Sequence, residues 1–595
     1  MSDIKLSGFF IIILLSLPVF SFPSEENSRD LETLVITKSR QSLLNTYSLN
    51  YENQSAFNYQ SSIEELKFLP VDLQYRSLQG AIQSDFSLRG SSFQQVLILL
   101  NGARINDPQT AHHNSDIPFT KEDIKSIEVM PGASSSLFGS DAIGGAINFI
   151  LDKPDERKIV IESGLGNNQN GYGIFSLSDT FKNLGYRFSV EDSQSQGFRY
   201  DTDFKKFTTS AASYLEFPGG SWNNNFGYQE KEFGAYDFYT PGLGYPSWEK
   251  TRTYLLNSTL SLKNNGFLLR PSFLWRRHFD KFALRRTVAS FNDHRTDSYT
   301  PGFYLKKEAT ALGDLGLGVE WNQERITSTN LGRHTRNHSS VFLDDSLKIR
   351  ENLDLGFSLR RDDFSDFDQV YTGSTSVKLE LTNQAALKLG ISRNMRIPSF
   401  TELYYSDQTT IGNTELACEK AWNYQAGLEY KQEEFSSGIV LFLRDERQMI
   451  DWVRSDPSQK WQAINFTKDK VFGVEYSLHK KINNLLSLDG NYVYTDKRID
   501  NQGYLYKYGP NYARHLINTV FNFELPFGRQ EIGFSYKKRP QRRGWLLIDA
   551  GLSCNLNRNS KIFLNSTNIL NVEYQDIAGI PEPGRYIEAG LRMEW

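Results

Sequence analysis

The feature that most constrains the fold is a two-residue alternation of apolar and polar side chains, which runs from about Ile159 to Trp595. In the segment 353–359, for example, Leu353, Leu355, Phe357 and Leu359 alternate with polar or small residues. This period places the apolar side chains on one face of a β-strand. A soluble sandwich also alternates, but it rarely extends over about 435 residues, whereas a barrel with a wet lumen repeats a polar interior without limit. At about 20 residues per strand and connection, the pattern predicts a transmembrane β-barrel of about 22 antiparallel strands.

Individual hairpins and the end of the chain fit this interpretation. The alternating runs 377–381 and 385–391 are separated by Thr382-Asn383, and the runs 472–478 and 486–494 by Asn483-Asn484, so each pair is expected to form a hairpin. The last residues alternate up to the terminal aromatic Trp595. Such an ending resembles the terminal strand by which outer-membrane barrels are recognised for assembly, although a soluble β-rich protein can also end this way.

Composition excludes several other classes of protein. The formal net charge of −4 gives no field that would attract nucleic acid, so we expect no nucleic-acid partner. The two cysteines, Cys418 and Cys554, have no spacing typical of a metal site or a disulfide scaffold. Aromatic residues make up 13% of the chain while the mean hydropathy is −0.49, a combination that suits a barrel rather than a helical membrane protein.

The N-terminus is expected to be a secretory signal peptide, residues 1–22. Lys5 precedes an uncharged apolar run, Leu6 to Phe20, which is shorter than the roughly 20 residues that a membrane-spanning helix needs. No later stretch of the sequence predicts such a helix, which leaves secretion or insertion as a barrel.

Residues 42–154 differ from the rest and predict a mixed α/β domain. The segment Ser61 to Leu66 has the pattern of a capped helix start. A barrel of about 22 strands would enclose an open hole. We therefore expect the N-terminal domain to be a plug inside the lumen of the barrel, which takes residues 155–595.

Three stretches of this domain resemble the TonB-dependent receptors: Phe86 to Gly90, Val96 to Pro108, and Ile127 to Ile150. The resemblance continues in the barrel, at 394–405, 412–430 and 568–595. The plug-motif residues that it indicates are Arg89, Gly90, Gly139, Gly144 and Gly145. One departure is Pro131-Gly132, where the family usually has Arg-Gly, and this substitution predicts that one plug-to-barrel ion pair is missing.

The linker 23–41 contains a segment that resembles the family's TonB box: Glu32, Thr33, Leu34, Val35, Ile36 and Thr37. An extended segment rich in β-branched residues can add as a strand to the sheet edge of a partner. A mere apolar patch in the linker is the alternative. The resemblance implies a monomeric, multi-pass protein of the outer membrane, in contact with lipid, which imports a scarce nutrient with proton motive force delivered by TonB, ExbB and ExbD.

The resemblance is strongest to the cobalamin-receptor branch, on chain length, compact loops, the TonB-box sequence, the run Gly139 to Asn148 and the stretch Lys231 to Gly242. Cobalamin is therefore the favoured cargo, and a ferric siderophore is the alternative. No enzyme motif is present, so we expect a transporter and not an enzyme.

The plug segment between Asn106 and Phe119 is the candidate ligand-binding loop. Its candidate contacts are Asn106, Gln109, His112, His113 and Asn114. Solvated loop histidines are the alternative interpretation, and because adjacent histidines seldom hold an ion without further ligands, no metal site is expected there. In the barrel loops, Asp201, Asp203 and Asp237 could form part of a calcium site, and we expect no other cofactor.

Overall fold

The structure is a computed structural model that describes residues 46–50, 56–76, 82–132, 134–310, 313–499, 503–509 and 511–595. The expected signal peptide, residues 1–22, and the expected TonB box, residues 32–37, lie outside the described residues.

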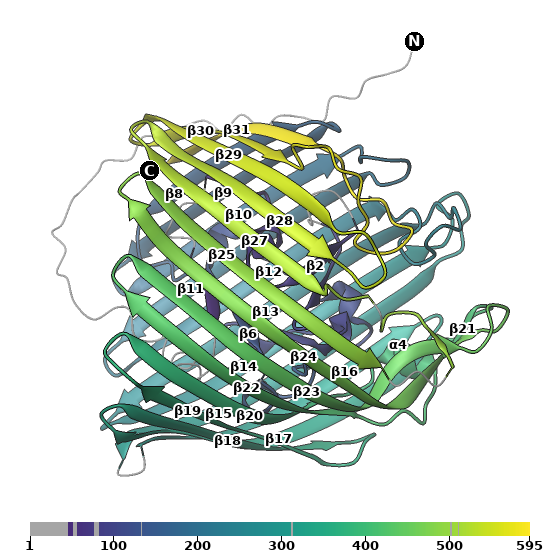
Figure 1. Ribbon diagram of the computed structural model, residues 1–595, viewed down its shortest axis with the longest axis horizontal. Coiled ribbons are helices and arrows are strands. Elements are labelled where there is room, and N and C mark those ends of the chain that lie inside the picture. Colours follow the sequence, from purple (N-terminus) through teal and green to yellow (C-terminus); the bar gives the residue numbers. More distant parts are fainter. Residues whose placement is uncertain are drawn as a thin grey trace.

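Strands β8 to β31 close into one barrel, whose strands run obliquely around the molecule (Figure 1). Of these 24 strands, β21 and β26 are two-residue additions, so the wall consists of 22 strands, each antiparallel to its neighbours, and the predicted fold is confirmed. The bounds are β8 Lys158–Gly166, β9 Asn170–Phe181, β10 Leu184–Ser195, β11 Phe204–Phe217, β12 Gly220–Gly234, β13 Trp248–Asn264, β14 Phe267–Ala283, β15 Asn292–Thr310, β16 Gly313–Ser328, β17 Gly332–Arg350, β18 Leu353–Phe364, β19 Val370–Glu380, β20 Ala385–Arg396, β21 Thr410–Ile411, β22 Glu419–Gln432, β23 Phe435–Arg454, β24 Trp461–Asn483, β25 Leu486–Ile499, β26 Leu505–Tyr506, β27 His515–Leu525, β28 Gly528–Lys538, β29 Trp545–Asn557, β30 Ser560–Thr567 and β31 Tyr586–Glu594.

The terminal strand closes the barrel. β31 is antiparallel to β8, and Trp595 and Ile159 exchange backbone hydrogen bonds of 2.8 and 3.0 Å. Both predicted hairpins are present, β19 with β20 and β24 with β25.

Apolar and polar side chains lie on the opposite faces from those expected in a soluble protein: apolar side chains face outwards and polar side chains face the lumen. On β18, Phe357 and Leu359 are exposed, while Arg360 and Asp362 are almost completely buried in the lumen. Apolar side chains outside and polar side chains inside are the pattern of a barrel in lipid. Among the described residues, no helix is long and apolar enough to cross a membrane.

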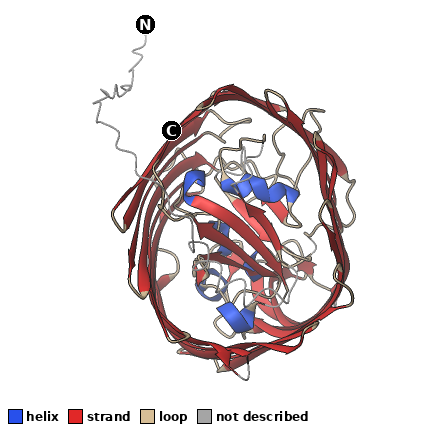
Figure 2. Ribbon diagram, turned by 90° about the vertical axis from the view of Figure 1, so that its left-hand side faces the viewer, coloured by secondary structure: helices blue, strands red, loops and turns tan. Residues whose placement is uncertain are grey.

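The plug lies inside the ring of strands, as the view along the barrel shows (Figure 2). Its five-stranded sheet has the order β1-β6-β7-β4-β5, with β4 parallel to β7, and a hairpin of β2 and β3 lies beside it. Buried side chains from β4, β6 and β7 form its core, including Ile98, Val129 and Phe149. The strand bounds are β1 Tyr47–Asn50, β2 Asp72–Tyr75, β3 Ser84–Ser87, β4 Val96–Leu100, β5 Ala103–Arg104, β6 Ile124–Pro131 and β7 Gly145–Leu151.

Short helices complete the plug and one barrel loop. The predicted helix start is confirmed: α2 follows Ser61, whose side chain accepts a hydrogen bond from the backbone N–H of Ile63. The bounds are α2 Ser62–Glu65, η1 Leu66–Phe68, η3 Phe93–Gln95, η4 Ala111–His113, η5 Lys121–Asp123 and α3 Ser135–Phe138 in the plug, and α4 Phe400–Tyr404 in the barrel.

Gly145 allows β7 to begin against the end of β6. Its φ is +137°, and a Cβ there would lie 2.3 Å from the carbonyl oxygen of Met130. We expect Gly145→Ala to destabilise the plug by about 3 kcal/mol, the upper end of the usual range for overpacking, because the obstacle is backbone. Limited proteolysis should then cleave the plug while the barrel keeps its heat-modifiable mobility on gels. Gly242→Ala, at φ +78° with open space around it, is the matched control, and equal protease resistance of both variants would contradict the prediction.

Candidate functional site at the plug apex

The candidate ligand-binding loop lies at the end of the barrel with the longer connections. The turn between β11 and β12 is Pro218 and Gly219, whereas the connection between β12 and β13 at the opposite end runs from residue 235 to 247. Long loops are extracellular in outer-membrane barrels. The backbone N–H groups of Phe400 and Thr401, in α4, donate to the carbonyl oxygens of Pro108 and Gln109, so the long loop that contains α4 covers the plug apex.

Two of the candidate contacts hold the apex loop in shape. The side-chain oxygen of Asn106 accepts from the N–H of Ile98 at 2.7 Å, and its amide donates to the carbonyl of Val96 at 3.1 Å. Asn114 accepts from the N–H of Asp107 at 2.9 Å. Both asparagines are buried and fasten the loop to itself and to β4, and a role in contacting cargo remains a prediction for them.

The two adjacent histidines are buried, with 7% exposure for His112 and 3% for His113, so the alternative of solvated histidines is wrong. His112 stacks on Phe93, with ring centroids 4.3 Å apart, and its Nδ1 lies 2.9 Å from Asp85. Burial lowers the pKa of His112 to about 4, against the opposing charge of Asp85. His112 is therefore neutral at neutral pH.

His113 points the other way, towards the barrel wall. Its Nε2 lies 3.3 Å from Asp280 of β14, and its Nδ1 4.0 Å from Glu249 of β13. Burial alone would lower the pKa of His113, but the hydrogen bond and charge of Asp280, with the charge of Glu249, raise it to about 9. Gln109 belongs to the same group, because its amide donates to Asp280 at 2.7 Å.

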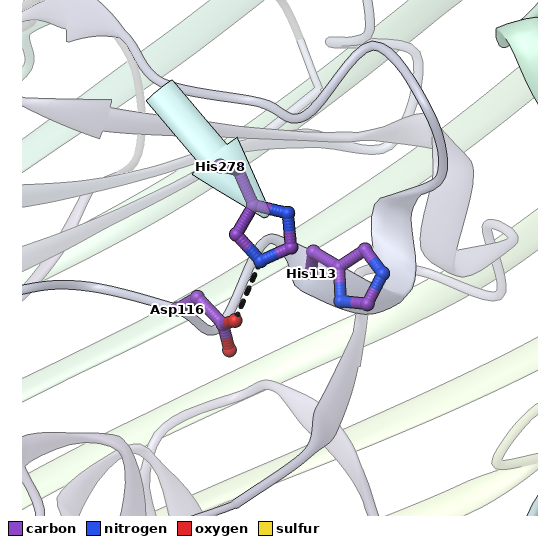
Figure 3. A group of neighbouring side chains, drawn as sticks. All are labelled: His113, Asp116 and His278. Atoms are coloured by element: carbon purple, nitrogen blue, oxygen red, sulfur yellow. Dashed lines mark hydrogen bonds and ion pairs between the residues drawn. The ribbon is translucent and has the colours of Figure 1, made fainter. Parts of the chain in front are cut away.

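More acidic and basic residues surround this point. Asp107 pairs with Arg276 of β14, and Asp116 pairs with Lys231 of β12 at 2.8 Å. The ring of His278, also on β14, lies between the two carboxylates, with Nε2 3.0 Å from Asp116 and Nδ1 3.3 Å from Asp107. Figure 3 shows His278 and His113 side by side above Asp116. The plug apex thus meets β12 to β14 through a buried cluster of histidines, carboxylates and two cations.

Buried ion pairs also fasten the rest of the plug to the barrel. In the plug motif, Arg89 donates to Glu475 of β24 from Nε at 2.9 Å and from Nη2 at 2.6 Å. Its guanidinium lies over the Phe442 ring, 4.6 Å from the centroid. Further pairs join Asp72 to Arg539, Arg104 to Glu324, Lys121 to Glu162, Glu122 to Arg592, and Asp123 to Arg187. The plug is therefore joined to the wall by several ion pairs, although Pro131 stands where the family usually has an arginine.

The motif glycines lie where the plug packs tightly. A Cβ on Gly90 would meet Thr495 of the barrel at 2.7 Å, and one on Gly139 would meet Arg360 at 3.2 Å. A Cβ on Gly144 would lie 2.4 Å from the Ser91 hydroxyl inside the plug. These positions serve plug packing and docking.

Two of the three residues of the expected calcium site, Asp201 and Asp203, are paired with an arginine side chain. Arg286 donates to Asp201 at 2.9 Å and to Asp203 at 2.6 Å, and Asp237 accepts from the backbone N–H groups of Gly244 and Tyr245. A calcium ion there would have to displace Arg286, and the calcium site stays a prediction.

A cavity of about 60 Å³ lies between the plug and the wall. Arg104, Glu320, Asn322 and Arg360 are among its lining residues, which also include Phe138 and Leu274. Such a space holds a few water molecules.

Sequence reasoning named Gln109 and His113 of the apex cluster, but it missed the plug residues Asp107 and Asp116 and every barrel residue of the cluster. Asp116 and His278 are 162 positions apart, and Glu249, Asp280 and Lys231 come from three different strands. In the sequence, the barrel residues of the cluster stand out only as polar residues at lumen-facing positions. Most lumen-facing residues are polar, so this signal does not single them out.

A plug held by ionic contacts inside a closed 22-strand barrel defines the class: a plugged β-barrel rather than an open pore. The family model "TonB dependent receptor-like, beta-barrel" matches residues 156–569, and "TonB-dependent Receptor Plug Domain" matches residues 50–146. The chain belongs to the TonB-dependent receptors. Members are transporters and receptors that bind small molecules, work with TonB and lie in the outer membrane, which the barrel crosses with strands.

Relatives in sequence and in structure name different cargoes. "Vitamin B12 transporter BtuB" of Photobacterium profundum is 24% identical over 487 residues, 78% of each chain, and that of Vibrio vulnificus (strain YJ016) is 24% identical over 75% of each chain. The siderophore receptor PirA of Pseudomonas aeruginosa has a TM-score of 0.74 at 17% identity, covering 92% of this chain and 99% of its own. A mutant of the ferric enterobactin receptor PfeA of the same organism has a TM-score of 0.79 at 14% identity, covering 95% and 100%. The structural likeness shows the fold alone.

Proposed function

We propose that this receptor imports cobalamin across the outer membrane, with energy that TonB, ExbB and ExbD transmit from the proton motive force. The observation that carries the proposal is the seated plug: buried ion pairs such as Arg89 with Glu475 and Asp72 with Arg539 fasten it to the wall of a closed barrel. Cargo can pass only when these contacts are broken, and the outer membrane has no energy source of its own.

The way the plug is seated in the lumen supports energised transport. The plug lies inside the ring of strands and is joined by buried ion pairs to β10, β16, β24 and β31. A molecule as large as cobalamin therefore needs the plug to move. We assign the TonB-binding segment on the periplasmic side to Glu32 to Thr37. Force that TonB applies to this segment would move the plug.

Cobalamin is favoured over a ferric siderophore by the sequence relatives. Three vitamin B12 transporters are similar over 72–78% of this chain, at 22–24% identity. The siderophore receptors resemble it in fold at 13–17% identity, which is a property of the shared barrel and plug.

Direct binding to the purified full-length protein tests the cargo. We expect cyanocobalamin to bind with a Kd in the micromolar range or below, about −8 kcal/mol, and ferric enterobactin not to bind at the same concentration. Isothermal titration in detergent measures both. Absence of cobalamin binding at micromolar concentration would remove the preferred cargo, and binding of the ferric siderophore instead would establish the alternative.

A further inference from the structure

We propose that the plug apex and the barrel wall together bind a divalent transition-metal ion of the zinc class. The ligands are His113 and Asp116 of the plug and His278 of β14 (Figure 3). One nitrogen or oxygen atom from each lies within 4.8 Å of the others, and all three side chains are buried. The proposal concerns the chemistry of this cluster and does not depend on which cargo the receptor imports.

The ligand types select the metal. Two imidazoles and a carboxylate suit Zn²⁺, Ni²⁺ or Co²⁺, whereas Ca²⁺ and Mg²⁺ prefer oxygen ligands alone and Cu(I) prefers sulfur. Zinc binds such atoms at about 2.0–2.2 Å. The His278 Nε2 and Asp116 Oδ2 atoms face each other at 3.0 Å, so an ion between them replaces their hydrogen bond and draws the His113 ring inwards.

Groups behind the ligands orient them as in known metal sites. His278 Nδ1 lies 3.3 Å from Asp107 Oδ2, within ion-pair distance but without a hydrogen bond, and a proton on that nitrogen leaves the lone pair of Nε2 facing Asp116. A carboxylate behind a ligating histidine is the usual arrangement in metal sites, because it fixes the ring and raises the basicity of the ligand nitrogen. Lys231 holds the Oδ1 atom of Asp116 at 2.8 Å and leaves Oδ2 facing His278.

Unpartnered buried atoms provide a second, independent observation. Within the part of the chain that the structure describes, the Oδ1 atom of Asp280 and the Oε1 atom of Gln109 are buried without a hydrogen-bond partner. Asp280 lies 3.3 Å from the His113 ring, and together with Glu249 it forms a second possible ligand group around the same histidine. Leaving a buried polar atom unpaired is unfavourable, so an ion with its bound water is a natural partner here.

The local charge also fits a divalent cation. Four carboxylates, Asp107, Asp116, Glu249 and Asp280, face two fixed cations, Lys231 and Arg276. When an ion displaces the proton that the raised pKa keeps on His113, the four carboxylate charges balance those of Lys231, Arg276 and the divalent ion. Because two ligands belong to the plug and one to the barrel, the ion ties the plug apex to the wall.

Zinc titration of the metal-free, full-length protein in detergent tests the site, with a chromophoric chelator as competitor. We expect one Zn²⁺ per protein with a Kd of micromolar or tighter. His113→Ala and His278→Ala should each weaken binding at least about 10-fold to 100-fold, the range known for the loss of mere supporting groups in metal sites. His338→Ala is the matched control. His338 also pairs with a carboxylate, Asp362, at 2.7 Å, but it belongs to neither group of possible metal ligands.

X-ray absorption at the zinc edge of the wild-type protein avoids any question about the folding of variants. We expect a shell of nitrogen and oxygen near 2.0–2.1 Å with the scattering of two imidazoles. No zinc binding by the wild type, wild-type affinity in both His113→Ala and His278→Ala, or an oxygen-only shell would each overturn the proposal.

Discussion

Deleting Glu32 to Thr37 is expected to abolish energised uptake while leaving cargo binding at the cell surface unchanged. An extended segment that adds to a partner's sheet carries force through a row of backbone hydrogen bonds. Without that segment TonB transmits no force to the plug, which stays fastened to the wall by buried ion pairs such as Arg89 with Glu475. Uptake of radiolabelled cyanocobalamin by cells, compared with binding to the same cells after treatment with an uncoupler, separates the two steps.

Two single substitutions sharpen this experiment. Val35→Pro removes the backbone N–H that a strand ladder needs, so we expect it to abolish uptake almost as completely as the deletion. Val35→Thr keeps both the N–H and the β-branched shape, and is the matched control. Energised uptake that survives the deletion would contradict TonB-driven import through this segment. Equal loss in the Pro and Thr variants would contradict strand addition as its mode of contact.

The fold could be predicted because its signals are local and repeated. The alternation on β18 and the turn at Thr382-Asn383 each specify a strand or hairpin by neighbouring residues alone. The strand number followed from length, because a strand and its connection together take about 20 residues on average. The plug motifs lie close together in sequence, between Phe86 and Ile150.

The apex cluster could not be predicted, because it depends on which lumen-facing residues meet the plug. Alternation shows that His278 and Asp280 face the lumen but not that His113 lies opposite them. Nor does sequence distinguish an asparagine that contacts cargo from one that fastens its own loop, as Asn106 does. These choices are made by the rotation and depth of the plug in the barrel, which long-range ion pairs fix.

Replacing Arg89 with Ala is expected to loosen the plug. Glu475 would then remain buried, at 1% side-chain exposure, without the guanidinium that neutralises it. Removing one partner of a buried ion pair costs about 3–5 kcal/mol, a large part of the roughly 5–15 kcal/mol that stabilises an ordinary domain. Because the lost contact joins the plug to β24, the effect should appear as a leak. We expect higher conductance in planar bilayers and faster proteolysis of the plug than in the wild type.

Two further variants separate the loss of this ion pair from a general loss of charge. Arg361→Ala removes an arginine from an exposed pair with Asp363, which is worth about 0–1 kcal/mol, so its conductance should match the wild type. Arg89→Met combined with Glu475→Leu removes both buried charges and should restore much of the docking, since apolar replacement of a buried pair is often neutral. If Arg89→Ala conducts no more than Arg361→Ala, this ion pair does not hold the plug. If the double variant leaks as much as Arg89→Ala, the geometry of the arginine, and not the unpaired charge of Glu475, is what keeps the plug in place.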